Sequence, residues 1–161
     1  MRKETYEKNL AYIFDPDRKG AKYSLNNGET WMNHGDFCEC LAKSVLGFEA
    51  VKDANTPSHL GHDIPELNAS VKSNNCGLSD RKDLKYLEAE EFVKRFFADE
   101  KRGTIYIYVF ECGEEVTLYY MNRKEFRTFI KKFARYDNYC GKLRFPKSDT
   151  KVVAWFEEKC A

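Results

Sequence analysis

Residues 104–136, TIYIYVFECGEEVTLYYMNRKEFRTFIKKFARY, carry the clearest structural pattern in the sequence. The segments TIYIYVFE and VTLYYMN alternate in polarity and are rich in β-branched and aromatic residues, which is typical of strands. Gly113 lies in the ECGEE turn between them, so the two segments predict a β-hairpin. Asn122 is a suitable N-cap for the amphipathic helix that follows. The apolar residues of this helix are expected to face the core: Phe126, Phe129, Ile130 and Phe133.

The N-terminal part of the chain predicts two helices separated by a loop. Residues 5–14 are expected to form a short helix. Residues 15–31 are polar and rich in turn-forming residues, which is typical of a loop. Residues 36–46, DFCECLAKSVL, predict a second helix that ends at Gly47. Its apolar face is expected to consist of Phe37, Cys38, Leu41, Ala42 and Val45.

Further segments complete the expected order of elements. Residues 48–54, FEAVKDA, predict a strand. Ser79 is a suitable N-cap for a charged amphipathic helix that ends near Gly103. Near the C-terminus, residues 142–145, KLRF, predict a short strand, and residues 151–158, KVVAWFEE, fit either a helix or a strand. Together with the hairpin, these elements predict a mixed α+β domain with helices packed on a central sheet.

Length and charge set the broad class of the protein. The chain has 161 residues, which indicates a single domain over residues 1–161 with a hydrophobic core that needs no cross-links. Its formal net charge is +1, so this total neither indicates nor excludes a nucleic-acid binder. No apolar run approaches the roughly 20 residues that a membrane span needs, so no association with a membrane is expected.

The six cysteines are scattered along the chain and are expected to be reduced thiols. The first residues contain no long apolar core, so no signal peptide is predicted and a cytoplasmic location is expected. Cys38 and Cys40 are too close together for the usual zinc-binding pair, and no second pair follows them. The cysteines are therefore interpreted as small buried hydrophobic residues.

Residues 61–73, GHDIPELNASVKS, contain the candidate chemistry. Two short strands, around HDI and ASVKS, are expected to be joined by the turn PELN. Ser70 and Lys72 are two residues apart and should share one face of their strand, with Asp63 set beside them across the turn. An aspartate placed there can bind Mg²⁺, which polarises a phosphate and activates a bound water. A nearby lysine can orient that water or balance the charge of the transition state.

The order of elements around this segment resembles that of the PD-(D/E)xK nuclease superfamily, which includes many restriction endonucleases. The resemblance covers residues 36–145, between an N-terminal extension and a short C-terminal tail, and begins with a helix that contains Glu39. It implies a restriction-endonuclease-like α/β/α fold with a mixed central sheet, and Mg²⁺ or Mn²⁺ as the cofactor. It also implies that Asp63 binds the metal ion and that Lys72 serves the water and the phosphate.

The sequence departs from the superfamily pattern at Ser70, where the pattern has Asp or Glu. Glu39 is the preferred replacement ligand, because a glutamate on the first helix lies near the site in many of these folds. Glu66 is nearer in sequence but is expected to face solvent in the turn. The Ser70 hydroxyl could instead hold a metal-bound water, or the site could be inactive.

Purely structural roles compete with each of these functional roles. Asp63 is also suited to capping a turn through its side chain. Lys72 is also suited to an edge strand, where lysine discourages aggregation. Glu39 is also suited to an ion pair with Lys43, four residues further along the helix.

The function expected from these observations is a metal-dependent endonuclease that hydrolyses phosphodiester bonds in DNA. The resemblance implies an enzyme similar to a restriction enzyme or a mobile-element nuclease that acts as a homodimer. The basic residues of the helix in residues 123–136 form an outer face that could follow a DNA backbone or simply be solvated. The alternatives are an inactive module of the same fold that binds DNA or a protein partner, and an interaction domain of a different α+β fold.

Overall fold

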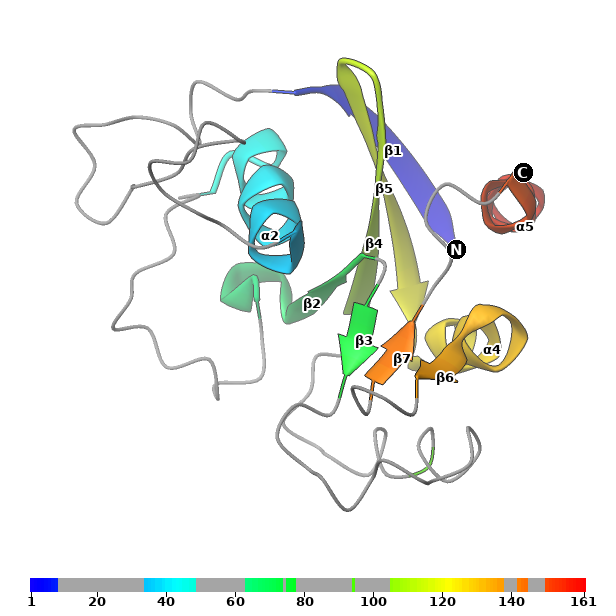
Figure 1. Ribbon diagram of the computed structural model, residues 1–161. Helices are drawn as coiled ribbons and strands as arrows, with labels where there is room; N and C mark the ends of the chain where they lie inside the picture. The colour runs from blue at the N-terminus through cyan, green and yellow to red at the C-terminus, as the bar shows by residue number, and fades with distance from the viewer. Residues whose placement is uncertain are drawn as a thin grey trace.

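The computed structural model describes residues 1–8, 34–48, 63–73, 75–77, 94, 105–137, 142–144 and 150–161. Within these ranges the main sheet has the strand order β1-β5-β4-β2 (Figure 1). Its strands are β1 (Arg2–Glu7), β2 (Ala69–Lys72), β4 (Ile105–Cys112) and β5 (Glu115–Asn122). Strand β5 is antiparallel to both β1 and β4, whereas β2 is parallel to β4. The sheet is therefore mixed, and together with the helices it confirms the predicted α+β class.

The predicted hairpin forms the centre of this sheet. Strands β4 and β5 pair over their whole length, from Ile105 opposite Asn122 to Cys112 opposite Glu115. Gly113 begins the turn with φ of +60°, a conformation that glycine adopts without the steric cost that other residues meet. The hairpin prediction is confirmed.

Helices cover the two faces of the sheet separately. Helix α2 (His34–Val45) lies on one face, and helices α4 (Arg123–Phe133) and α5 (Thr150–Cys160) lie on the other (Figure 1). Alternate residues of β4 supply both cores: Ile107 and Val109 pack with α2, whereas Tyr106 and Tyr108 pack with α4 and α5. The predicted inner face of the first of these helices is confirmed, with Val45 at its half-buried margin, and Gly47 follows the helix with φ of +77°.

The core under α4 and α5 is largely aromatic. Phe129 is completely buried, and its ring lies 5.4 Å from that of Tyr108 and 5.0 Å from that of Phe156, measured between ring centroids. The rings of Tyr119 and Phe156 stack at 4.2 Å. These contacts join both helices to both strands of the hairpin, because each helix contributes a ring to the same cluster. The predicted inward face of α4 is confirmed, with Phe133 half-buried at its edge.

The start of α4 is fixed by a capping box that also binds the N-terminus. Asn122 Oδ1 accepts a hydrogen bond from the Glu125 backbone N–H at 2.9 Å, and Glu125 Oε2 accepts one from the Asn122 backbone N–H at 2.8 Å. Glu125 Oε1 accepts a third from the Met1 ammonium group, also at 2.8 Å. One carboxylate therefore attaches the first residue of β1 to the first turn of α4. The predicted N-cap is confirmed.

Two helix predictions are wrong in the described ranges, and Cys112, which was expected to be buried, is exposed. Residues 5–7 were expected to begin a helix, but they belong to β1, whose six residues all pair with β5. Pairing overrides the helical pattern, because Glu4 and Tyr6 alternate onto one face and the hydroxyls of Tyr6 and Tyr120 donate to Glu4. The second error is the end of α4, which was expected to continue to residue 136 but stops at Phe133, since Ala134 has an extended conformation.

Three short strands from separate parts of the chain form a second sheet. Strands β3 (Asn75–Gly77), β7 (Lys142–Arg144) and β6 (Arg135–Asp137) form an antiparallel sheet with β7 in the middle. This confirms the predicted strand in residues 142–145. Residues 151–158, which fitted either element, belong to helix α5. Glu157 of α5 accepts a hydrogen bond from the Tyr119 hydroxyl at 2.9 Å and pairs with Lys3, so the helix is held to both β5 and β1.

Several predicted elements lie outside the described residues. These are the loop in residues 15–31, residues 9–14 of the predicted first helix, residues 49–54 of the predicted strand, and the helix predicted from Ser79 apart from Lys94. None of the helices in the described ranges combines the length and the apolar character that crossing a membrane requires.

Replacing Phe129 by alanine should destabilise the protein more than any single change at the edge of this core. Loss of a completely buried phenylalanine typically costs about 3–5 kcal/mol, because the cavity collapses only in part. Phe133→Ala is the matched control, since Phe133 is half-buried and should cost clearly less. Denaturant unfolding of both variants measures the difference, and equal losses would contradict the central position of Phe129.

Glu125→Gln should make stability less dependent on pH in the acid range. Partial burial by itself would raise the pKa of the Glu125 carboxyl, but the hydrogen bonds from the Met1 ammonium and the Asn122 N–H outweigh this and lower the pKa below its usual 4.5. A lowered pKa stabilises the fold above the unfolded-state pKa, and this contribution disappears as the pH falls through the folded-state pKa. The glutamine keeps the capping geometry but not the charge.

The expected loss of stability in Glu125→Gln is about 1 kcal/mol at pH 7, and the difference from the wild type should shrink as the pH falls below about 4. Urea unfolding at pH 7 and pH 3 measures both values. Glu114→Gln, an exposed glutamate in the hairpin turn, is the control. A difference that does not change with pH would show that the charge of Glu125 does not stabilise the fold.

Candidate functional site

The segment before β2 folds into a compact turn. Ile64 forms an isolated antiparallel bridge with Ala69, and residues Pro65–Leu67 form a single 3-10 turn between them. Asn68 closes the turn with φ of +51°, a left-handed conformation that asparagine tolerates better than most residues. The Asp63 backbone N–H donates to the Ala69 carbonyl at 3.0 Å. The predicted turn is confirmed, and it returns the chain beside the start of β2. The strand expected around HDI is not formed in the described residues, where Ile64 makes only the single bridge.

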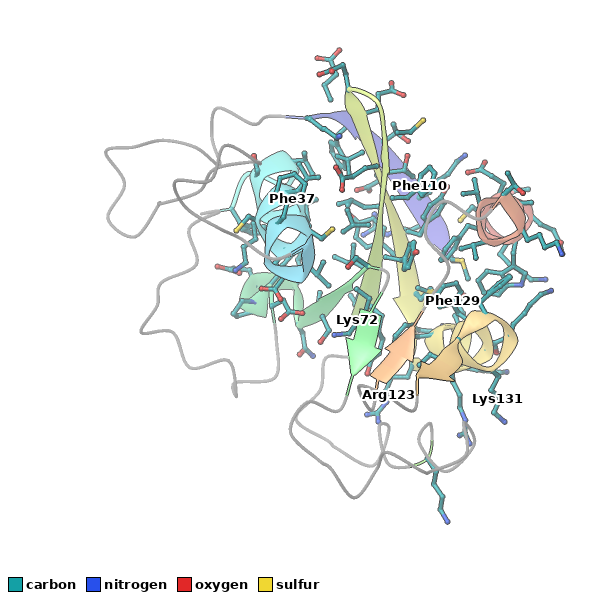
Figure 2. The ribbon with its side chains drawn as sticks, in the orientation of Figure 1. Phe37, Lys72, Phe110, Arg123, Phe129 and Lys131 are labelled. Atoms are coloured by element: carbon teal, nitrogen blue, oxygen red, sulfur yellow. The ribbon has the colours of Figure 1, made fainter. Side chains whose placement is uncertain are left out.

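The two faces of β2 are occupied as the alternation predicts. Ala69 and Val71 are buried against α2. Ser70 and Lys72 therefore project to the opposite face, where their register partners on β4 are Tyr106 and Tyr108. Ser70 is only 5% exposed, whereas Lys72 is half-buried. The position where a superfamily carboxylate is expected is thus a buried serine. Figure 2 shows Lys72 at the end of β2 that leads to the second sheet.

Asp63 is attached directly to β2 through its side chain. Its Oδ2 accepts a hydrogen bond from the backbone N–H of Val71 at 2.6 Å. The residue that donates lies between Ser70 and Lys72, so the carboxylate is held beside the strand that carries both. A hydrogen bond to an ionised acceptor is short and strong, and it fixes one of the two oxygens. The capping role considered for Asp63 therefore exists, and it leaves Oδ1 as a second acceptor.

Asp63 and Lys72 do not neutralise each other. Among the residues that the structure describes, Lys72 makes no ion pair with any carboxylate, Asp63 included. A direct ion pair would commit both groups to a structural role. Their separation leaves a carboxylate and an ammonium group near the same short strand, each able to contact a ligand.

The two other predicted acidic residues are placed differently. Glu39 lies on α2, two residues from both Phe37 and Leu41, which corresponds to about 200° of rotation around a helix axis. It is therefore on the side of α2 away from the residues that face the sheet, and α2 covers the face opposite to Ser70 and Lys72. Glu66 is exposed in the 3-10 turn, as expected. The structure does not bring Glu39 together with Ser70 and Lys72.

The described ranges contain no group of three or more His, Cys, Asp or Glu side chains that could hold a metal ion. Asp63, Glu39 and Glu66 thus do not form a three-carboxylate site. Mg²⁺ in nucleotide-processing sites is often held by one or two carboxylates plus water and substrate phosphate. A single fixed aspartate fits one position of such a site.

Sequence reasoning missed a cluster of ionisable groups on β1 and β5. Glu4 accepts hydrogen bonds from the hydroxyls of Tyr6 and Tyr120, and these bonds lower the pKa of its carboxyl against the opposing effect of burial. Burial and the bond to Glu4 raise the pKa of Tyr120. Arg2 lies over the Tyr120 ring at 3.8 Å and pairs with Glu4. The spacing of Arg2, Glu4 and Tyr6 by two residues was the available signal, but the helix prediction concealed it.

Comparisons with protein-family models, with curated proteins and with solved structures find no match for this chain.

Asp63→Ala and Asp63→Asn should separate the structural role of this side chain from any chemical one. Alanine leaves the Val71 N–H without its acceptor, which should cost about 1–3 kcal/mol of stability. Asparagine keeps an oxygen acceptor and should cost clearly less. Denaturant unfolding measures both losses, and equal stability of the two variants would contradict a stabilising role for the hydrogen bond.

Proposed function

We propose that this chain is a metal-dependent nuclease that hydrolyses phosphodiester bonds in DNA, with a restriction-endonuclease-like fold. The observation that carries the proposal is the 2.6 Å hydrogen bond between Asp63 Oδ2 and the Val71 N–H. It holds a carboxylate beside the strand that also carries Lys72, without an ion pair between the two. The parallel pairing of β2 with β4 supports the fold, because it requires a long crossover connection like the one that the resemblance implies.

Asp63 would hold the metal ion through Oδ1, since Oδ2 is committed to the backbone. A bound Mg²⁺ or Mn²⁺ supplies Lewis-acid polarisation of the phosphate and a more acidic water. Asp63 needs no side-chain movement to keep its position, because the turn and the hydrogen bond already fix it. Such preorganisation is what makes a charged group effective at a reacting centre.

Lys72 would bind the scissile phosphate or orient the attacking water. Its stem lies along a buried strand, and its ammonium group can oppose the negative charge developing on the phosphate. The half-buried environment strengthens this interaction relative to one in open solvent.

The identity of a second acidic ligand distinguishes two versions of this site. Glu66 lies on the turn that leads directly into β2, three residues after Asp63, and its side chain is exposed. Glu39 lies on α2, which packs on the opposite face of the sheet from Ser70 and Lys72. This placement favours Glu66 over Glu39 as the second ligand.

A specific observation also favours a second function. Ser70 is 5% exposed at the position where the superfamily has a carboxylate, and no three candidate ligands gather in the described part of the chain. A module of the same fold that binds DNA or a protein partner without cutting is therefore the alternative.

A cleavage assay with supercoiled plasmid and linear duplexes tests the proposal. With Mg²⁺ or Mn²⁺, the wild type should cut, and chelation should abolish cutting. Asp63→Asn and Lys72→Ala should each lower the rate by about 100-fold or more, because each removes a charge from the reacting centre. Glu114→Gln and Lys159→Ala are matched controls, because both residues are exposed and distant in sequence from Asp63 and Lys72. Both variants should cut DNA like the wild type.

The pattern of results separates the two functions. Loss of cutting in Glu66→Gln but not in Glu39→Gln would identify the second ligand. Absence of cutting on every substrate, with DNA binding that does not respond to metal, would overturn the nuclease proposal in favour of the binding module. Sedimentation of the wild type with and without a duplex tests the expected homodimer, which would place one site on each DNA strand.

A further inference from the structure

Helix α4 presents a continuous basic stripe to solvent. Lys124, Arg127 and Lys131 are exposed and lie at positions i, i+3 and i+7, which places them on one side of a helix. They stand opposite the buried residues Phe126 and Phe129, and Figure 2 shows Lys131 projecting outward from α4. Seven residues of helix correspond to about 10 Å, so the stripe spans about three steps along one strand of duplex DNA.

Lys124 and Arg127 of this stripe have no acidic partner within α4. The helix contains a single acidic residue, Glu125, whose carboxylate is occupied by the Met1 ammonium and the Asn122 N–H. Among the described residues, Lys124 and Arg127 make no ion pair. Positively charged side chains at these spacings repel one another and slightly destabilise a helix. A contribution to the stability of α4 therefore does not explain the stripe.

The stripe and the candidate site lie on the same side of the main sheet. Ser70 and Lys72 project to the face of β2 opposite α2, which is the face that α4 and α5 cover on β4 and β5. A ligand on the outer side of α4 and a ligand at Lys72 would thus lie on the same side of the main sheet.

The second sheet connects the end of the stripe to the candidate site. Strand β6 begins two residues after Phe133, and β3 begins three residues after Lys72. Strand β7 pairs with both, so β6 and β3 are separated by two strand spacings, about 10 Å. The register aligns Arg135 with Arg144 and Arg144 with Asn75 in one row. The backbones of β6, β7 and β3 thus lie side by side between the end of α4 and the end of β2.

We propose that the basic stripe of α4 forms the surface that binds the phosphate backbone of duplex DNA and directs it to the edge of β2. This inference rests on the proposed function for the identity of the ligand. The recognition is of charge and spacing rather than of base sequence, since lysine and arginine on an exposed helix contact phosphates along one strand. The surface therefore accounts for positioning and not for sequence specificity.

Binding of a fluorescent 20-base-pair duplex, measured by anisotropy in a chelator, tests the inference without cleavage. The double variant Lys124→Ala/Arg127→Ala is compared with Lys151→Ala/Lys159→Ala, which removes the same charge from exposed positions on α5. Each lost phosphate contact should make the slope of log affinity against log salt less negative by about 0.9. It should also weaken binding roughly 10-fold at 0.1 M salt. The α5 variant should bind like the wild type. Thermal unfolding of both variants verifies that they are folded.

The outcomes separate this inference from the nuclease proposal. A weaker affinity and a shallower salt dependence in the α4 variant alone support the surface, whether or not the protein cuts DNA. Equal binding by the α4 variant and the wild type, or equal losses in the two double variants, overturns it, even if cleavage depends on Asp63. Binding of anionic lipid vesicles through α4, without binding of the duplex, also overturns it.

Discussion

The rest of the structure depends on burying both faces of the β4–β5 hairpin. Alternate residues of β4 supply two separate cores, with Ile107 and Val109 under α2 and with Tyr106 and Tyr108 under α4 and α5. A shift of the register by one residue would move every side chain of β4 to the opposite face. Because both faces are buried and filled with different side chains, the register is strongly specified. That register fixes β1 on one edge and β2 beyond β4 on the other. The candidate site owes its position to this constraint, since β2 is placed by its pairing with β4 and its packing on α2.

Two carboxylates have comparable structural roles, one beside each edge strand of the sheet. Glu125 connects the N-terminus to the start of α4, and Asp63 connects the turn to β2. Each accepts a hydrogen bond from a backbone N–H, but they differ in how many of their oxygens are used in this way. Both oxygens of Glu125 accept hydrogen bonds, whereas within the described residues only Oδ2 of Asp63 does. This difference is the physical basis for proposing chemistry at Asp63 and stability at Glu125.

The proposed nuclease site and the proposed DNA surface place different demands on the fold. A reacting centre needs groups held within a few tenths of an ångström, and the turn around Asn68 and the bond to Val71 provide this for Asp63. A backbone-binding surface needs only charge at suitable spacing, which an exposed helix supplies without precise side-chain positions. The second sheet links the two requirements, because β3 follows Lys72 and β6 follows α4.

The sequence by itself determined the elements whose pattern is local. The hairpin, the cap of α4 at Asn122, the end of α2 at Gly47 and the alternation of β2 follow from propensity, capping and period, which neighbouring residues decide. Only the tertiary structure decided that residues 5–7 form an edge strand, that residues 151–158 are helical, that Ser70 is buried and that Glu39 lies on the helix across the sheet. These outcomes depend on contacts between residues far apart in the chain. An edge strand is stabilised by pairing with its partner, and a short helix is stabilised by packing on a sheet. A local sequence pattern therefore does not reveal these outcomes.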